Sequence, residues 1–154
     1  MRKFLTPIVL AAVVVSMPVV MAPKQGKPAK DYSNDPRLDS LRKFFRRSAC
    51  PAERFSHVFL ETADAYDLDW RLLPSLSFVE SSGGKSAPNN NMFGWNSGRT
   101  RFTSLAAGIH SVGYWLTHLP LYRGKDVDSL LATYNPDEDY RRTVKWVMRS
   151  IAPN

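Results

Sequence analysis

The stretch Ser75-Leu-Ser-Phe-Val-Glu-Ser-Ser-Gly-Gly84 indicates what kind of fold this chain has. It continues an apolar run that begins at Leu72 and in which apolar side chains recur at helical spacing, so a buried helix is predicted. Gly83 and Gly84 predict its end, because glycine readily adopts the left-handed conformation of a helix C-cap. Glu80 then falls in the last turn, where the partial negative charge of the helix end disfavours an anion. Such a carboxylate is either a surface residue at a fraying end or a residue kept for its chemistry.

The segments around this stretch also have helical patterns, punctuated by caps and prolines. Helices are predicted after Pro36, after Pro51, from Leu105 to Leu116, through Leu130 and Leu131 to Tyr134, and after Pro136. The expected N-caps are Asp35, Asp69 for the helix that carries Glu80, Thr103, Asp126 and Asn135. The segment 86–101 is rich in Asn, Ser and Gly, which predicts a loop with room for at most one short β-hairpin. Because no sustained alternating pattern occurs, the expected fold is mainly α.

The N-terminal residues predict export from the cytoplasm. Arg2 and Lys3 precede the uncharged segment 4–22, which has the pattern of a secretory signal and is also long enough to attach the protein to a membrane. The expected location is the periplasm or cell envelope. The expected organisation is a signal peptide or N-terminal membrane anchor at 1–22, a flexible linker at 23–35 and one folded domain at 36–154.

Composition excludes several classes of protein. The net charge of +7 suits either simple solubility or attraction to a polyanion such as the bacterial wall. The single cysteine, Cys50, cannot form an internal disulfide, and no paired Cys/His spacing predicts a metal site. We therefore expect neither a metal nor a cofactor. The basic flank of the last predicted helix lacks a reading helix or stacking platform beside it, so nucleic acid is not an expected partner.

Two later segments accompany Glu80, namely Asn89-Asn-Asn-Met-Phe-Gly-Trp95 and a tyrosine at Tyr134. The sequence Glu-Ser-Ser-Gly-Gly that begins at Glu80 resembles the catalytic Glu-Ser motif of the lysozyme-like superfamily, in particular lytic transglycosylases and bacterial glucosaminidases. The asparagine-rich segment resembles the Asn-Asn-x-Phe-Gly segment of the glucosaminidase branch. Tyr134, followed by Tyr140 and Val144, is similar to the C-terminal tyrosine pattern of that branch.

The resemblance covers residues 52–152 and implies a lysozyme-like helical domain with a substrate cleft. It further implies cleavage of the glycan strands of bacterial peptidoglycan between N-acetylmuramic acid and N-acetylglucosamine units. Breaking a glycosidic bond requires an acid that protonates the leaving oxygen, and Glu80 is the expected acid and, in a second step, the base. As the resemblance implies, Tyr134 would line the cleft and either orient the carboxylate or steady the positive charge that develops on the sugar.

Further residues are expected to bind substrate: Ser81, Ser82, Asn90, Asn91, Phe93 and Trp95. The serines would bond the carboxylate or an N-acetyl group, unless they only solvate the helix end. The asparagines would position sugar hydroxyls or acetamide, unless they only form turns. Of the two aromatic residues, Phe93 is expected to fill the core and Trp95 to face the cleft.

The chain contains no Asp or Glu from Ser81 to Lys125, where glucosaminidase relatives commonly supply a second carboxylate. This departure predicts a one-carboxylate mechanism of the lytic transglycosylase kind. The acidic run 137–139 is interpreted as a stabilised helix N-terminus, with Asn135 and Glu138 as a capping box. The alternative to an enzyme is a catalytically silent peptidoglycan-binding or scaffold protein on the same fold.

Overall fold

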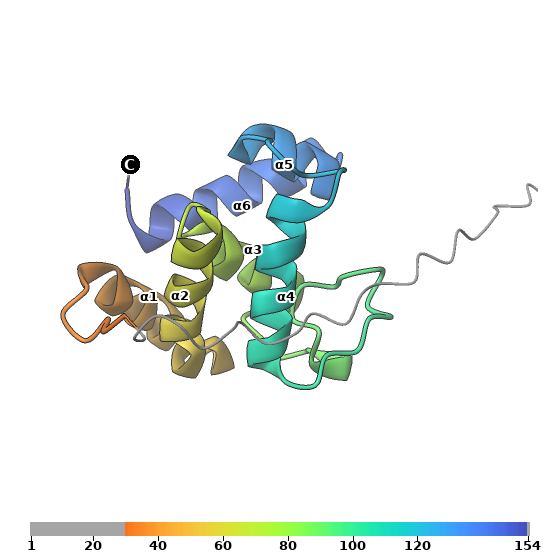
Figure 1. Ribbon diagram of the computed structural model, residues 1–154. Coiled ribbons are helices and arrows are strands. Elements are labelled where there is room, and N and C mark those ends of the chain that lie inside the picture. The colour runs from red at the N-terminus through yellow and green to blue at the C-terminus, as the bar shows by residue number, and fades with distance from the viewer. Residues whose placement is uncertain (1–29, 154) are drawn as a thin grey trace, which may run out of the picture.

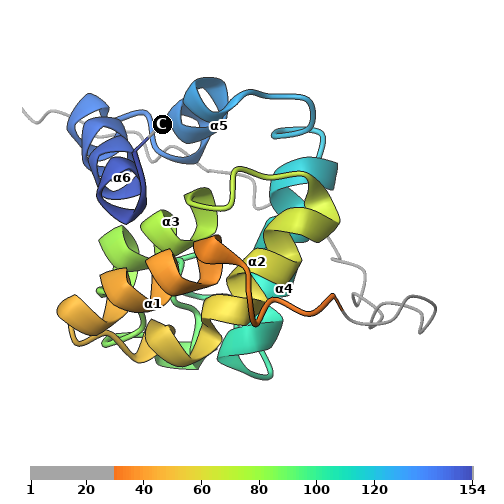
Figure 2. The same ribbon diagram turned by 90° about the vertical axis from the view of Figure 1, so that its left-hand side faces the viewer.

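The computed structural model describes residues 30–153, and helices are the only regular secondary structure in that range (Figures 1 and 2). The expected mainly α fold is confirmed, and no strand forms in the segment 86–101. The helices are α1 (Pro36–Arg47), α2 (Ser56–Tyr66), α3 (Leu72–Ser81), α4 (Leu105–His118), α5 (Val127–Tyr134) and α6 (Glu138–Ile151), with short 3-10 turns η1 (Pro51–Phe55) and η2 (Pro88–Asn90). The segment 1–22, expected to be a signal peptide or anchor, lies outside the described residues. Between residues 30 and 153 no helix is long and apolar enough to cross a bilayer.

Helix α3 lies at the centre of the other helices, and all of its residues from Leu72 to Ser77 are buried, the small serines Ser75 and Ser77 included (Figures 1 and 2). Leu73 and Leu76 have no exposed surface, and α6 packs against α3. Burying one such leucine stabilises the fold by about 1.5–3 kcal/mol. On the neighbouring side, α2 packs closely on α4 at Gly113, where an added Cβ would lie 2.3 Å from Cγ2 of Thr62. The helix that carries Glu80 is therefore fixed from several directions.

Two of the predicted N-caps are confirmed and two are shifted. Asp35 and Asp126 cap α1 and α5 through their side chains. The cap of α4 is Ser104, whose hydroxyl accepts from the N–H of Ala107 at 3.0 Å, so the prediction of Thr103 is wrong by one residue. Both residues are good caps by type, and only the backbone conformation distinguishes them.

The start of α6 also differs from the prediction. Its N-cap is Asp137, which accepts from the N–H of Tyr140 at 3.0 Å, so the proposed capping box of Asn135 and Glu138 is wrong. The side chain of Asn135 instead accepts from the N–H of Asp137 in the turn before the helix. The fifth predicted cap, Asp69, is also wrong: the N-cap position of α3 is Arg71 and has no side-chain cap, and the carboxylate of Asp69 accepts from the N–H of Arg71 in the turn before the helix.

Helix α3 ends one residue earlier than its glycines predict. Ser82 adopts the left-handed conformation with φ 52° and donates its N–H to the carbonyl of Phe78 at 2.9 Å. Gly83 follows with φ 65°, and a Cβ on it would meet the Cβ of Cys50 at 2.8 Å. Glycine is thus required at 83 by both conformation and space. Glu80 lies in the last turn of α3, as predicted.

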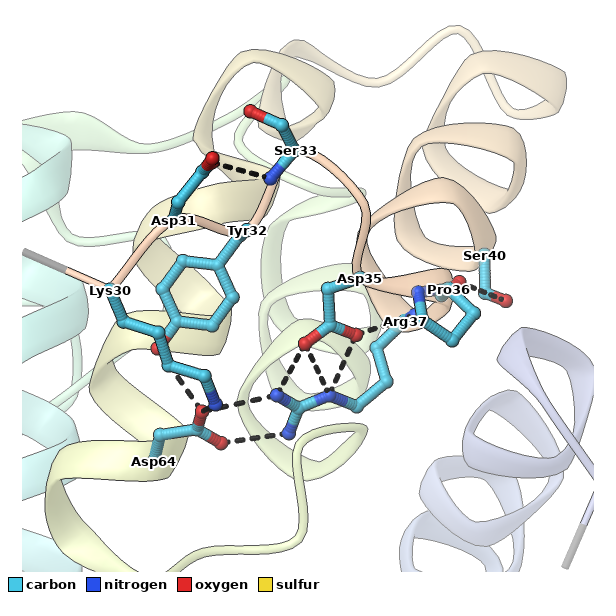
Figure 3. Close-up of polar contacts among 9 residues, drawn as sticks. All are labelled: Lys30, Asp31, Tyr32, Ser33, Asp35, Pro36, Arg37, Ser40 and Asp64. Atoms are coloured by element: carbon cyan, nitrogen blue, oxygen red, sulfur yellow. Dashed lines mark hydrogen bonds and ion pairs between the residues drawn. The ribbon is translucent and has the colours of Figure 1, made fainter.

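The end of the predicted linker belongs to the folded domain (Figure 3). Tyr32 is buried, and its hydroxyl donates to the carboxylate of Asp64 on α2 at 3.1 Å. Lys30 and Arg37 bind the same carboxylate at 2.6 and 2.7 Å, and Arg37 also binds Asp35. The expectation that the linker extends to residue 35 is therefore wrong for 30–35. A single tyrosine without apolar periodicity gave no sign of this anchoring.

The anchoring predicts a pH-dependent stability. Hydrogen bonds from Arg37, and then from Lys30 and Tyr32, hold the pKa of Asp64 well below its ordinary value despite partial burial. Because the folded-state pKa is lowered, this stabilisation is complete above the unfolded-state value of about 3.9 and is lost as the pH falls toward the folded-state value. Asp64→Asn is expected to lower the free energy of unfolding by about 1 kcal/mol at pH 7. In urea titrations the difference from wild type should shrink below pH 4. Asp67→Asn is the control, because Asp67 is exposed and has no ion pair with another residue of 30–153; an equal loss there would contradict the prediction.

Candidate functional site

A pocket of about 270 Å³ opens beside the C-terminal end of α3. Its walls come from α3, from the loop before α4 and from the segments on both sides of α5. The lining residues are Glu80, Phe93, Gly94, Trp95, Asn96, Ser97, Tyr122, Tyr134 and Asn135. Among the residues that the structure describes, Glu80 is the only acidic one that lines this pocket. The pocket thus presents a single carboxylate to any ligand.

The carboxylate of Glu80 is hydrogen-bonded at one oxygen and lies close to Gly94 at the other. Tyr140 of α6 donates its hydroxyl to Oε1 at 2.7 Å. On the other side, a Cβ added to Gly94 would lie only 2.8 Å from Oε2. Gly94 also has φ 60°, a conformation that glycine adopts without strain. A side chain at residue 94 would therefore displace the carboxylate.

The two tyrosines of this region have different partners from those expected. Tyr134 donates its hydroxyl to the carbonyl of Phe93 at 2.5 Å, and Tyr140 is the residue that orients Glu80. The orienting role that the resemblance implied for Tyr134 is therefore corrected in favour of Tyr140. Tyr134 still lines the pocket, with its ring stacked on that of Tyr140 at a centroid distance of 6.2 Å.

Both phenols keep their protons. Burial first, and then the negative charge of Glu80, raise the pKa of Tyr134 well above its ordinary value. Burial and then the hydrogen bond to Glu80 raise the pKa of Tyr140 far above the physiological range. Both side chains consequently remain hydrogen-bond donors at neutral pH. The site combines one carboxylate with a fixed neutral donor.

Trp95 lines the pocket, as expected for the aromatic residue of the loop. The ring is half-buried, with the rings of Trp115, Tyr122 and Tyr134 at centroid distances of 5.0, 5.9 and 5.9 Å. These contacts fix the orientation of the indole from three sides. Flat aromatic surfaces of this kind are suited to stacking on the apolar faces of ligands.

Ser81 and the two asparagines belong to the scaffold behind the pocket and not to its lining. The Ser81 hydroxyl is buried, lies 2.8 Å from the Met92 carbonyl and accepts from the N–H of Gly84. It joins the end of α3 to the loop. The expected contact of Ser81 with substrate is corrected to this structural role, because the buried hydroxyl is bonded to backbone groups and Ser81 does not line the pocket.

The asparagines stabilise the loop that carries Trp95. Buried Asn91 donates to the carbonyls of Trp95 and Thr100 at 2.9 and 3.1 Å and accepts from the N–H of Trp95 at 2.9 Å. Asn90 donates to the carbonyl of Phe102 at 2.9 Å. The expected sugar contacts of Asn90 and Asn91 are therefore replaced by loop contacts, which are the alternative that asparagine in a turn allows.

The remaining predicted residues divide between core and surface. Phe93 is buried, as expected for the residue that fills the core, and it lines the pocket beside Gly94. Ser82 is exposed at the end of α3 and is not part of the pocket lining. The residues that sequence reasoning missed are Tyr122, Asn96, Ser97 and Asn135, along with the orienting role of Tyr140. The tyrosine pattern included Tyr140, but its apolar neighbours on the helix predicted a core position.

Comparison with protein-family models, with curated proteins and with solved structures finds no match for this chain. Within residues 30–153, no group of His, Cys, Asp and Glu side chains is arranged to hold a metal ion. The geometry of the Glu80 pocket is therefore the basis for a functional proposal.

Proposed function

We propose that this chain is an exported, lysozyme-like enzyme that cleaves the glycan strands of bacterial peptidoglycan between N-acetylmuramic acid and N-acetylglucosamine units. The observation that carries the proposal is the Glu80 carboxylate, which faces a pocket with aromatic walls and is oriented by a neutral tyrosine. A sugar ring can stack on the aromatic surface while its glycosidic oxygen lies near the carboxylate. The residues 4–22 would direct export and, if retained, attach the enzyme to the membrane.

In this mechanism Glu80 transfers its proton to the leaving glycosidic oxygen as the bond to the anomeric carbon breaks. Glu80 is exposed in the free protein, and a bound glycan would cover it and exclude water from the reacting bond. The hydrogen bond from Tyr140 keeps the carboxyl group in one orientation during the transfer. The resulting carboxylate then stabilises the positive charge on the sugar.

The second step needs a base and a nucleophile, and Glu80 is the one carboxylate that lines the described pocket. Glu80 can take the proton from the 6-hydroxyl of the same sugar, which closes an anhydro ring without water. Assistance by the N-acetyl group of the substrate is the other route that avoids a second acid. Mass spectrometry of the muropeptides released from purified wall, after borohydride reduction, tests the proposal: an anhydro product supports ring closure, and intact wall contradicts cleavage.

A second candidate is a peptidoglycan-binding protein without activity. It is favoured by the exposure of Glu80, since an exposed carboxylate can accept hydrogen bonds from sugar hydroxyls without transferring a proton. Both candidates predict sedimentation with purified wall. Zymography on gels that contain cell wall separates them, because a cleared band requires cleavage.

The orienting role of Tyr140 gives a specific prediction. Tyr140→Phe removes one hydroxyl and keeps the ring, so the Glu80 carboxyl loses its fixed donor. We expect the rate of wall cleavage to fall about 10- to 100-fold, a barrier change of about 1.4–2.7 kcal/mol. Tyr114→Phe, at a half-buried tyrosine of α4 that stacks on His118 and does not line the Glu80 pocket, is the matched control and should retain full activity. Equal activity of both variants would show that Glu80 needs no orienting donor.

A further inference from the structure

A second pocket, of about 350 Å³, lies on another part of the surface, where α1, η1 and the start of α2 meet. Its lining consists of Arg42, Cys50, Pro51, Glu53, Arg54 and His57. None of these residues belongs to the Glu80 pocket. Arg42 comes from α1, Arg54 from η1 and His57 from α2, so the lining takes three exposed, nitrogen-bearing side chains from separate elements.

The positive charge in this pocket is not compensated. Elsewhere in the fold, Arg37 and Arg71 each bind an aspartate. Arg42 and Arg54, by contrast, have no ion pair with any carboxylate of residues 30–153. Among the described residues, Glu53 is the only acid that lines this pocket. Its Oε1 already accepts from Nε and Nη2 of Arg46, at 2.9 and 2.7 Å.

The surroundings add to this excess. Asp39, the acid on α1, is bound by Lys43 at 2.6 Å and so is not available to Arg42. Lys85 extends toward the same region, where its ammonium group donates to the carbonyl of Ser48 at 2.9 Å. Arg54 lies over the ring of Phe55 at 5.9 Å, which leaves its N–H groups without a carboxylate partner among residues 30–153. The pocket is therefore a concave surface with an excess of positive side chains, a condition that favours an anion.

We propose that this pocket binds a phosphate group. A guanidinium group matches the oxygens of phosphate in paired hydrogen bonds, and such charge-assisted bonds are stronger than neutral ones. A carboxylate has two oxygens and one negative charge, whereas a phosphate monoester has three terminal oxygens and up to two negative charges, so phosphate is the better match for two guanidinium groups. A tetrahedral phosphate offers an oxygen to each of Arg42, Arg54 and His57 at once. The phosphate can belong to a soluble ester or to a lipid headgroup.

This second pocket is separated from the Glu80 pocket by the turn that ends α3. Its floor residue Cys50 lies against Gly83, where an added Cβ would approach the cysteine Cβ to 2.8 Å. The N–H of Ala52 donates to the Gly83 carbonyl at 3.0 Å. The end of α3 therefore lies between the two pockets, and a phosphate in one leaves the other open. This inference does not depend on the proposed glycan cleavage.

The test uses the full-length chain and glycerol 3-phosphate, with sodium chloride of equal ionic strength as the blank. Binding is measured by calorimetry for wild type, for the double variant Arg42→Gln/Arg54→Gln and for the control Arg47→Gln/Arg123→Gln. Arg47 and Arg123 are exposed and outside the pocket, so the control removes the same charge. We expect saturable binding that weakens at least tenfold in the pocket variant and less than twofold in the control. Thermal unfolding of each variant confirms that it is folded.

A second experiment, with lipid vesicles, distinguishes a lipid headgroup from a soluble phosphate ester. Sedimentation is compared with vesicles of phosphatidylglycerol and of phosphatidylcholine, because attachment through residues 4–22 would be common to both. A preference for phosphatidylglycerol that the pocket variant loses and the control keeps assigns the site to a lipid headgroup. Binding of glycerol 3-phosphate without that preference assigns it to a soluble ester. The proposal is overturned if wild type saturates with neither probe, or if both double variants weaken binding equally.

Discussion

Glu80→Gln is expected to abolish wall cleavage, with a loss of about a thousandfold or more, while the protein remains folded. Glutamine keeps the shape of the side chain and can still accept the hydrogen bond from Tyr140, but it has no acidic proton to give to the leaving oxygen. Because Glu80 lies on the surface of the pocket and is not in the core, the melting temperature should change little. The measurement is the release of muropeptides from purified wall, together with thermal unfolding.

The same assay tests whether one carboxylate is sufficient. Amide substitutions at the other candidate acids should each retain at least a tenth of the activity, a barrier change below about 1.4 kcal/mol. These acids are Asp64, Asp67, Asp69, Asp126, Asp128, Asp137, Glu138 and Asp139. Glu138→Gln is the closest chemical match to Glu80→Gln and lies exposed at the start of α6. A folded variant in this set that falls as far as Glu80→Gln would be the second catalytic carboxylate.

Gly94→Ala should also cause a large loss of activity, about a hundredfold, because it acts on the position of the same carboxylate. The new methyl group would lie 2.8 Å from Oε2 of Glu80, so the carboxyl must rotate or shift. A displacement of about 1 Å in a reacting group can reduce a rate by about a hundredfold. The measurement is again muropeptide release, with sedimentation on wall as a separate measure of binding.

The loop supplies a matched control for the backbone strain of this substitution. Gly98 also has a positive φ, at 77°, but a Cβ there would meet nothing within 4 Å. Gly98→Ala therefore introduces similar conformational strain without touching Glu80, and its activity should stay within a few-fold of wild type. If both alanine variants lose activity equally, loop strain and not carboxylate displacement is the cause.

The sequence pattern was sufficient for the helical character of the fold and for the place of Glu80. The recurrence of leucines before Glu80 and the glycines after it are local signals, and local signals determine where a helix ends. Local sequence signals did not, however, distinguish Thr103 from Ser104 as the N-cap of α4. Both hydroxyls suit a cap, and tertiary packing of the preceding loop selects the one with extended backbone.

The site was less accessible to sequence reasoning because it depends on contacts between distant segments. Tyr134 and Tyr140 are both plausible partners for a carboxylate, and only the packing of α6 on α3 brings Tyr140 to Glu80. Asn91 has the chemistry of a sugar ligand, yet its amide is used by Trp95 and Thr100. In each case the residue type predicted that the side chain would form hydrogen bonds, but it did not predict which group would be the partner.

The hydrogen bond between Tyr140 and Glu80 also has a consequence for the order in which the site is assembled. Its two residues are 60 positions apart in the chain, and Tyr140 is synthesised after Glu80. During synthesis, α3 can form before α6 exists, but the carboxyl oriented by Tyr140 cannot. Loops of this length form contacts late in folding, since their closure costs more entropy than local contacts do. On the proposed function, a chain in which α6 has not yet packed on α3 would not cleave the wall. It would gain activity only when α6 packs in place.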